Sequence, residues 1–417
     1  MFLDILHQKQ WDYKMPLYDK YFEHVEYIKE STAQPRISII VISWRLHRDT
    51  LESFRILQQQ RSEQNFELIF VDNGGKDNEF LELKPYVDIY IRLNQNTGAY
   101  LARNIGSVFA TAPILLFLED DGIPDIDFVS SHLAIFDNYD VVSVRGVYLC
   151  KTDNPLNERQ NVYYWGQKSF PAFVSLEGNA SYLASHFFEV GGWDDQIRYG
   201  HGGLELALRL LEKDSDKRKH MYSPIPVIYH DLVKDEQQFF SKRQKHIEAF
   251  KYLLEKHPTV NKHIEEWQGM FLNEDKLYLK ENLDRSITLS DLQKRVFERN
   301  KKQIDRMNHL FVPSYDPQRI QDTFESIIGS RRCLIFGAGS LGTNILNILK
   351  KNDIEPVLFL DNDTQKWGES LQGLEIKGPN DITEGDFIVI ASIYSYEISE
   401  QLQKKGLVKN RDFIIMK

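Results

Sequence analysis

Apolar and polar residues alternate in blocks along the first half of the chain, and the blocks predict strands and helices in turn. Four runs rich in β-branched and aromatic residues have the composition of buried strands: RISIIVISWR at 36–45, ELIFVDNGG at 67–75, VDIYIRLN at 87–94 and APILLFLEDD at 112–121. Between them, segments 49–61 and 97–111 carry apolar residues at helical spacing. Strands that alternate with helices predict a parallel sheet with helices on both faces.

The pattern of apolar and polar residues is different outside this region. Residues 1–35 mix aromatic and charged side chains, and we expect helices there that pack on the segment after residue 35. Residues 236–330 are charged and amphipathic, which predicts helices. At residue 331 a second α/β pattern begins. The sequence thus predicts an α/β domain over 1–235 with its core at 36–235, a helical connector over 236–330, and a small α/β domain over 331–417.

Composition narrows the class of protein. The 417 residues carry a net charge of −10 with acidic and basic residues intermixed, which argues against nucleic-acid binding. Cys150 and Cys333 are too few and too distant for a disulfide framework or a zinc site, and they fit a reducing cytoplasm. No run approaches the ~20 apolar residues of a membrane span. We expect a cytoplasmic protein with no transmembrane segment.

Three consecutive carboxylates, Glu119, Asp120 and Asp121, come directly after the apolar run at 114–118. In parallel sheets, ligands bind at the carboxyl ends of the strands. Like charges this close destabilise one another, and a divalent cation such as Mg²⁺ or Mn²⁺ removes that cost. A solvated acidic turn is the plain alternative. Placement after a buried strand, downstream of two other polar strand ends, favours the metal site.

Further motifs extend this pattern in a fixed order. They are Ile42-Ser43-Trp44, Val71-Asp72-Asn73-Gly74-Gly75, Asn96-Thr97-Gly98, Ala102-Arg103-Asn104-Ile105-Gly106, Glu119-Asp120-Asp121 and Gly191-Gly192-Trp193-Asp194. With them, residues 36–235 resemble the family 2 glycosyltransferases, which have a GT-A fold, and Glu119-Asp120-Asp121 matches the family's DXD metal motif. Six motifs in order are specific, whereas each alone is weak.

The resemblance implies a role for each matching residue. It implies that the nucleotide-sugar is bound by Ser43, Asp72, Asn96, Gly98, Arg103 and Asp120. It implies that Mn²⁺ or Mg²⁺ is held by Glu119, Asp121 and His230, although an ordinary histidine at a strand end is an equal alternative for His230. The metal would stabilise charge on the departing nucleoside diphosphate. The implied reaction moves a sugar, with inversion, from a nucleoside-diphosphate sugar, UDP-sugars first, to a saccharide, peptide or other acceptor.

The chain departs from the family where the family carries its catalytic base. Counting back from Arg209, the usual Glu-Asp pair falls on Gly202 and Gly203. His201, Glu205 and Asp194 are nearby replacements, with His201 slightly ahead because a histidine titrates near neutral pH.

Two other interpretations of the departure stay open. In the first, the reaction mechanism does not use this base. In the second, the domain has lost its transfer activity and is a degenerate nucleotide-sugar-binding or scaffolding protein. If transfer is slow for want of the base, Asp restored at position 203 is expected to speed it.

The C-terminal segment carries a second motif. Gly337, Gly339 and Gly342 have G-x-G-x-x-G spacing after the strand CLIF, and Asp361 ends the next strand. This is the dinucleotide-binding arrangement and resembles small Rossmann-like modules. It implies a nucleotide, a nucleotide-sugar or NAD(P) as ligand. A purely structural or homo-oligomerising domain is the alternative. An oxidoreductase is least favoured, because no Tyr-x-x-x-Lys pair accompanies the glycines.

Overall fold

A computed structural model describes most of the chain. The described residues are 15–29, 34–61, 65–76, 78–152, 157, 164–264, 277–280, 289–310, 317–392 and 394–416. The chain divides into two compact units. Residues 1–151 and 167–299 belong to the first unit, and residues 152–166 and 300–417 belong to the second. The predicted connector at 236–330 is therefore shared between the two units.

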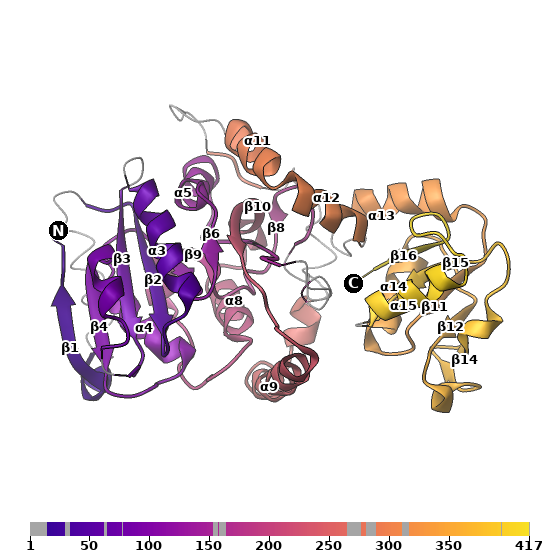
Figure 1. The fold of residues 1–417 in the computed structure, drawn as a ribbon, viewed down its shortest axis with the longest axis horizontal. Coiled ribbons are helices and arrows are strands. Elements are labelled where there is room, and N and C mark those ends of the chain that lie inside the picture. Colours follow the sequence, from indigo (N-terminus) through magenta and orange to yellow (C-terminus); the bar gives the residue numbers. More distant parts are fainter. Residues whose placement is uncertain are drawn as a thin grey trace. The chain divides into compact units, whose positions relative to one another are not determined.

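A mixed β-sheet forms the centre of the first unit (Figure 1). Its strand order is β1-β4-β3-β2-β5-β9-β7-β10-β6, and β8 pairs with β10 at the side. The strands are β1 (Phe22–Tyr27), β2 (Ile37–Ser43), β3 (Phe66–Asp72), β4 (Ile89–Leu93), β5 (Ile114–Leu118), β6 (Ile123–Pro124), β7 (Ser143–Leu149), β8 (Phe170–Pro171), β9 (Asn179–Leu183) and β10 (His220–Tyr229).

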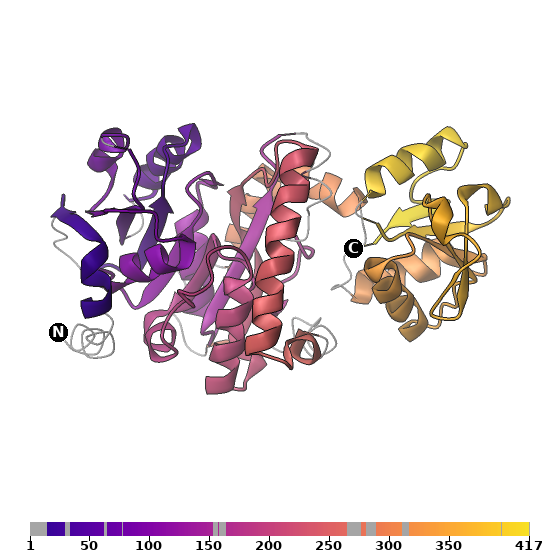
Figure 2. The same ribbon diagram turned by 90° about the horizontal axis from the view of Figure 1, so that it is seen from below.

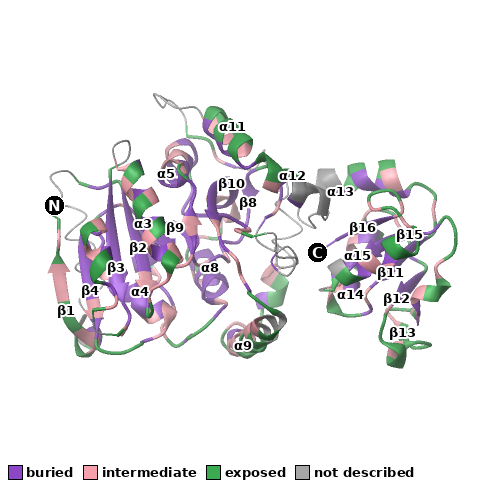
Figure 3. Ribbon diagram, viewed as in Figure 1, coloured by how far each residue is buried: buried purple, intermediate pink, exposed green. Residues whose placement is uncertain are grey.

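The run β4-β3-β2-β5 is parallel, as the alternating pattern predicts. All four strands are almost wholly buried, since helices and loops cover both faces (Figure 3). In the register, Ser43 pairs with Asp72 and Asp72 pairs with Arg92. The polar residues that end these strands therefore meet at one edge of the sheet.

The prediction of helices over 1–35 is wrong for residues 22–27. They form β1, an edge strand antiparallel to β4. The pairing with β4 supplies backbone hydrogen bonds that no local pattern reveals. The mixed burial of β1 is typical of an edge strand, which explains why its sequence does not alternate cleanly (Figure 3).

Helices flank this sheet within the described part of the first unit. They include α3 (Arg48–Gln60), α4 (Ala99–Val108), α5 (Phe128–Asn138), α7 (Ala184–Glu189), α8 (Gly202–Lys213), α9 (Glu236–Lys256) and α11 (Leu289–Arg299). Helix α4 packs on β2 and β3. It comes close because Gly106 has no side chain: a Cβ there would lie 2.7 Å from Ile40 Cγ2.

Helix α9 packs along α8 through an apolar cluster that includes Leu204, Leu208 and Leu253 (Figure 2). Each of the two helices presents an apolar stripe to the other, as amphipathic helices do. The packing places α9 in the first unit, although the sequence assigned it to a connector.

Helix α11 also belongs to the first unit, and an ion pair anchors it. Arg299 donates to both carboxylate oxygens of Asp125, at 2.9 and 2.6 Å, and to Asp127 at 2.5 Å. Burial acts to raise the pKa of Asp125, but the hydrogen bonds from Arg299, from the Asp127 N–H and from Tyr229 outweigh it and lower that pKa. Asp125, the partner of Arg299 in this ion pair, comes directly after β6.

The second unit has its own sheet, in the order β13-β14-β12-β11-β15-β16. Strands β14, β12, β11, β15 and β16 are parallel to their neighbours in that run. Its elements are α12 (Lys301–Leu310), α13 (Pro317–Thr323), β11 (Cys333–Phe336), α14 (Ser340–Lys351), β12 (Leu358–Leu360), β13 (Ser370–Leu371), β14 (Leu374–Lys377), β15 (Phe387–Ile390), α15 (Ser395–Lys404) and β16 (Phe413–Ile415). Strand–helix alternation at 331–417 is thus observed as predicted.

In the part of the chain that the structure describes, no helix is both long and apolar enough to cross a membrane.

Candidate functional site

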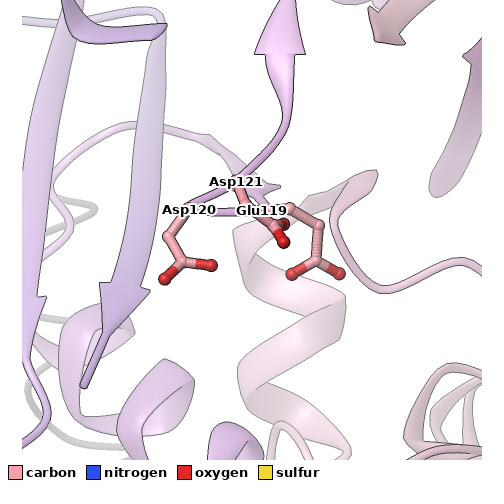
Figure 4. Close-up of side chains that lie close together, drawn as sticks. All are labelled: Glu119, Asp120 and Asp121. Carbon is pink, nitrogen blue, oxygen red and sulfur yellow. The ribbon is translucent and has the colours of Figure 1, made fainter. Parts of the chain in front are cut away.

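The acidic turn after β5 brings three carboxylates together. One oxygen of each of Glu119, Asp120 and Asp121 lies within 4.8 Å of the others (Figure 4). In the close-up, the Asp120 side chain extends to one side of the turn and the Glu119 side chain to the other. The turn is tied to its surroundings by Glu119, whose N–H donates to the Gly178 carbonyl at 3.1 Å. The sequence therefore places the cluster correctly at the carboxyl end of a buried strand.

Asp120 faces the end of β2. Ser43 donates its hydroxyl proton to Asp120 Oδ2 at 2.5 Å, and His47 Nε2 lies 3.7 Å from the same oxygen. Burial and the charge of Asp121 raise the pKa of Asp120 to about 7, against the hydrogen bond from Ser43. Burial and the neighbouring carboxylates thus favour the protonated, neutral form of Asp120.

Asp121 faces the end of β10 instead. His230 Nε2 lies 2.9 Å from Asp121 Oδ1. Burial acts to raise the pKa of Asp121, but the hydrogen bond and charge of His230 outweigh it, with help from His47 and Lys151, and lower that pKa. The His230 Nδ1 atom is buried and has no hydrogen-bond partner among the described residues. The structure thus joins two residues 109 positions apart that the resemblance named as metal ligands.

The donor set fits a hard divalent cation. Carboxylate oxygens suit Mg²⁺ and Mn²⁺, and an imidazole nitrogen is tolerated by Mn²⁺. Glu119, Asp121 and His230 would hold such an ion. It would place positive charge where the acidic side chains now repel one another.

Glu119 forms an ion pair with Arg103. Arg103 from α4 lies 3.4 Å from Glu119 Oε2 and sits 5.7 Å from the ring centroids of both Tyr100 and Trp193. Arg103 is almost wholly buried, with a side-chain exposure of 5%. A buried guanidinium needs anionic partners, and Glu119 is one of them.

Asp72, predicted to bind the nucleotide, is fully buried, and both of its oxygens are engaged within the protein. Oδ1 accepts from the Gly75 N–H at 2.7 Å, and Oδ2 accepts from Tyr90 at 2.8 Å and from Arg92 at 3.2 Å. Burial raises its pKa, while these donors oppose the rise. In this arrangement Asp72 shapes the turn after β3.

Asn96 and Gly98 lie on the loop before α4, which Asn73 holds in place. Asn73 Oδ1 accepts from the Thr97 N–H at 2.9 Å, and its amide nitrogen donates to the Gly98 carbonyl at 3.2 Å. Gly98 has φ of 89°, a region that glycine tolerates best. These hydrogen bonds fix the loop, and none of them involves the acidic turn.

Two candidate bases, Asp194 and Glu205, share one lysine. Lys256 Nζ donates to Asp194 at 2.8 Å and to Glu205 at 2.7 Å. Glu205 also forms a bidentate pair with Arg209, and its side chain has no exposed surface. Burial opposes ionisation of both carboxylates, but their cationic partners outweigh it and lower both pKa values. Cationic side chains inside the protein thus already engage both carboxylates.

His201 is the residue before α8 and has φ of 60°. Its ring lies 5.2 Å from the rings of His246 and Phe250, both on α9. Burial, and then the charge of His246, lower its pKa to about 4. The imidazole is therefore neutral at physiological pH, and its contacts are with α9.

Sequence reasoning missed Glu177. Its Oε1 accepts from the Tyr100 hydroxyl at 2.8 Å and from the Gly203 N–H at 3.0 Å. Burial raises its pKa, while Arg103, the Gly203 N–H and Tyr100 oppose the rise. One signal was present: Glu177 directly precedes Gly178-Asn179-Ala180, a segment that comes before the Gly191-Gly192-Trp193-Asp194 motif and also resembles the family.

In the second unit, the glycine-rich turn is sterically required. Gly337 has φ of 127°, and a Cβ there would lie 2.2 Å from the Ala391 carbonyl oxygen. A Cβ on Gly342 would lie 1.9 Å from the Gly337 oxygen. Gly339, which precedes α14, has open space around it. Two of the three predicted glycines are thus needed for the turn itself.

Asp361 lies at the end of β12, beside this turn. Its Oδ2 accepts from the Ala338 N–H at 2.9 Å and from Lys366 at 3.0 Å. Burial acts to raise its pKa, but these donors and the Asp363 N–H outweigh it and lower that pKa. The structure therefore brings Asp361 to the glycine-rich turn, where an internal ion pair holds it.

Fold and site together define an α/β protein with a cluster of acidic side chains, a candidate cation site, at the carboxyl end of a parallel strand. Residues 38–189 match the family model described as glycosyl transferase family 2, and residues 329–413 match the model described as C2185-like, N-terminal. Residues 38–189 thus have the sequence of a family 2 glycosyltransferase domain.

A curated relative agrees with this assignment. It is the uncharacterized glycosyltransferase YfnE of Bacillus subtilis (strain 168), which is 26% identical over 117 residues. The match spans 27% of this chain and only 30% of the length of that relative.

Two solved structures show a general likeness. The mannosyltransferase PcManGT from Pyrobaculum calidifontis is 14% identical, with a TM-score of 0.40 over 72% of this chain and 87% of that one. The glucosyl-3-phosphoglycerate synthase from Mycobacterium tuberculosis is 13% identical, with a TM-score of 0.40 over 53% of this chain and 78% of that one. These low scores leave the family assignment resting on the sequence match.

Proposed function

We propose that the first unit transfers a sugar from a nucleoside-diphosphate sugar, UDP-sugars first, to a hydroxyl of a saccharide, peptide or other acceptor, with inversion. The observation that carries the proposal is the cluster of Glu119, Asp120 and Asp121 within 4.8 Å, in a family 2 domain. A bound Mn²⁺ or Mg²⁺ would offset the negative charge that builds up on the leaving diphosphate.

The chain's own residues would divide the remaining work. Glu119, Asp121 and His230 hold the cation, and Asp120 with Ser43 faces the ribose. The turns after β2 and β3 would line the nucleotide site, and Asp72 would hold the turn after β3 through its hydrogen bond from the Gly75 N–H. Positioned groups that need no rearrangement lower the barrier most effectively.

Thermal unfolding of the full chain with a panel of nucleotide-sugars, with and without Mn²⁺, tests the donor and the cation together. A donor at 100 times its Kd is expected to stabilise the protein by about 2.7 kcal/mol. Asp121→Ala should abolish the manganese-dependent part of that shift. Glu52→Ala is the matched control, because Glu52 is an exposed acid on α3. Undiminished manganese-dependent stabilisation of Asp121→Ala would contradict the proposed site.

The alternative function is a nucleotide-sugar-binding protein that does not transfer, which the Gly202-Gly203 departure favours. Release of nucleoside diphosphate separates the two. A protein that binds a donor with Mn²⁺ yet releases no diphosphate over many hours is a binding protein.

We also propose that the glycine-rich turn of the second unit binds a nucleotide, a nucleotide-sugar or NAD(P), as in a Rossmann-like module. The close approach of Gly342 to Gly337 and the position of Asp361 support this. Calorimetric titration of the full chain with NAD⁺, NADPH, UDP and UDP-glucose tests it. Asp361→Asn should weaken binding of whichever ligand gives heat, and no heat from any of them would refute the proposal.

A further inference from the structure

A carboxylate from another segment of the chain accepts a hydrogen bond from the first turn of α8. Glu177, in the loop before β9, directs Oε1 at the Gly203 N–H, 3.0 Å away. Tyr100 joins the same arrangement: it donates to Glu177 at 2.8 Å and accepts from the Gly202 N–H at 3.0 Å. The positive end of a helix dipole stabilises a negative charge placed there.

The two glycines leave the room that this carboxylate uses. A Cβ on Gly203 would lie 3.3 Å from the Glu177 Cγ atom and 2.9 Å from the Ser175 carbonyl carbon. A Cβ on Gly202 would lie 2.2 Å from the Tyr100 ring. A side chain at position 203 and the present Glu177 therefore compete for one space. The carboxylate missing from α8 is replaced by one from the loop before β9.

Glu177 also lies close to the acidic turn. The next residue, Gly178, touches Glu119 so closely that a Cβ there would lie 2.1 Å from the Glu119 Cγ atom. The charges of Glu119 and Arg103 both act on Glu177. Glu177 therefore bonds to the first turn of α8, while the next residue in the chain contacts the acidic turn.

One oxygen of Glu177 remains for a ligand. Oε1 receives the two hydrogen bonds described above, whereas no donor among the described residues reaches Oε2. Glu177 as a whole is only partly buried. Glu205 and Asp194 differ from it, because cationic side chains engage their carboxylates.

We propose that Glu177 is the base that takes the proton from the acceptor. This inference rests on the proposed transferase function. The acceptor oxygen forms a bond to the anomeric carbon, and the bond from that carbon to the diphosphate oxygen breaks, with its electron pair leaving on the diphosphate. The acceptor proton passes to Glu177 Oε2 and then to solvent. A positioned base of this kind contributes roughly 10²–10⁴-fold to a rate.

The variant Glu177→Gln separates basicity from structure. A glutamine oxygen can still accept from Tyr100 and from the Gly203 N–H, so the fold should persist, but the amide cannot take a proton. With the donor and Mn²⁺ pair that stabilises the wild-type chain, diphosphate release is expected to fall roughly 100-fold or more. The melting shift caused by donor and Mn²⁺ should be unchanged. Glu212→Gln on α8 is the control, because the Glu212 side chain is 67% exposed.

Chemical rescue supplies the second measurement. Glu177→Ala leaves a gap in which formate can replace the carboxylate. Added formate should therefore raise the rate of diphosphate release by this variant, and it should leave the wild-type rate unchanged. Wild-type rates in Glu177→Gln would overturn the assignment. Joint loss of donor binding and activity, without formate rescue, would also overturn it and make Glu177 a structural residue. If the wild-type chain binds donors yet releases no diphosphate, the transferase function itself fails.

Discussion

Aspartate at position 203 is the most informative single substitution, because it returns a carboxylate to the place where family 2 enzymes usually carry one. From the sequence alone, Gly203→Asp is expected to speed transfer. The structure reverses that expectation. The new Cβ would meet the Ser175 carbonyl carbon at 2.9 Å and its oxygen at 3.0 Å, and backbone atoms cannot swing aside. Overpacking of this kind costs about 1–3 kcal/mol.

Charge adds to the steric cost. The new carboxylate would lie about 4 Å from that of Glu177, where two unit charges repel by about 4 kcal/mol at an effective dielectric constant of about 20. Protonation of one of the pair limits the penalty. We therefore expect Gly203→Asp to lose about 3 kcal/mol in all, which lowers the melting temperature by about 6–12 °C.

A double-variant cycle by thermal unfolding and diphosphate release measures this reasoning. Adding Glu177→Gln to Gly203→Asp should recover the electrostatic part of the loss and leave the steric part, so the two changes are not additive. Diphosphate release by the double variant should exceed that of Glu177→Gln alone, because a carboxylate returns to the same space. If Gly203→Asp is as stable as wild type and faster, then Glu177 does not fill that space and the reasoning is refuted.

Two further substitutions test the packing of each unit. Arg299→Ala should cost about 3 kcal/mol at pH 7, because the buried Asp125 loses its charged partner. Since the folded pKa of Asp125 is lowered, that contribution is present above the unfolded value of about 3.9 and is lost as the pH falls. Urea midpoints of wild type and Arg299→Ala should therefore converge below about pH 4, and a constant gap would argue against the ion pair. Gly342→Ala should lower the melting temperature of the second unit through its clash with the Gly337 oxygen, whereas Gly339→Ala, with open space, should not; equal effects would contradict the geometry of the turn.

Continuous apolar runs made much of the fold predictable. Strands β2 to β5 and the acidic turn could be predicted from β-branched segments that end in polar residues, because both faces of a parallel sheet are buried. Strand β1 was not predictable, since an edge strand with mixed burial has no clear period. The true partners of Asp72 were hidden as well: Tyr90 and Arg92 come from the neighbouring strand, and register, not sequence spacing, brings them close.

The acceptor side of the site was the least predictable part. Motif comparison looks for a carboxylate at a fixed position on α8, and there it finds Gly203. A lone Glu177 in an irregular segment carries no periodic signal. Only the three-dimensional approach of that segment to the helix shows that a charge is still present at the same place.

The end of β10 has a consequence for how the protein can be probed. His230 comes directly after β10, and α9 starts at Glu236, so only a short tether separates the imidazole from that long helix. Lys242 of α9 reaches back to the Leu232 carbonyl and pins the tether. A cation bound by the imidazole would fix the His230 end of this stretch as well. Tryptic cleavage after Lys234 should then slow when manganese is added. The rate of cleavage would therefore report how much of the site is occupied.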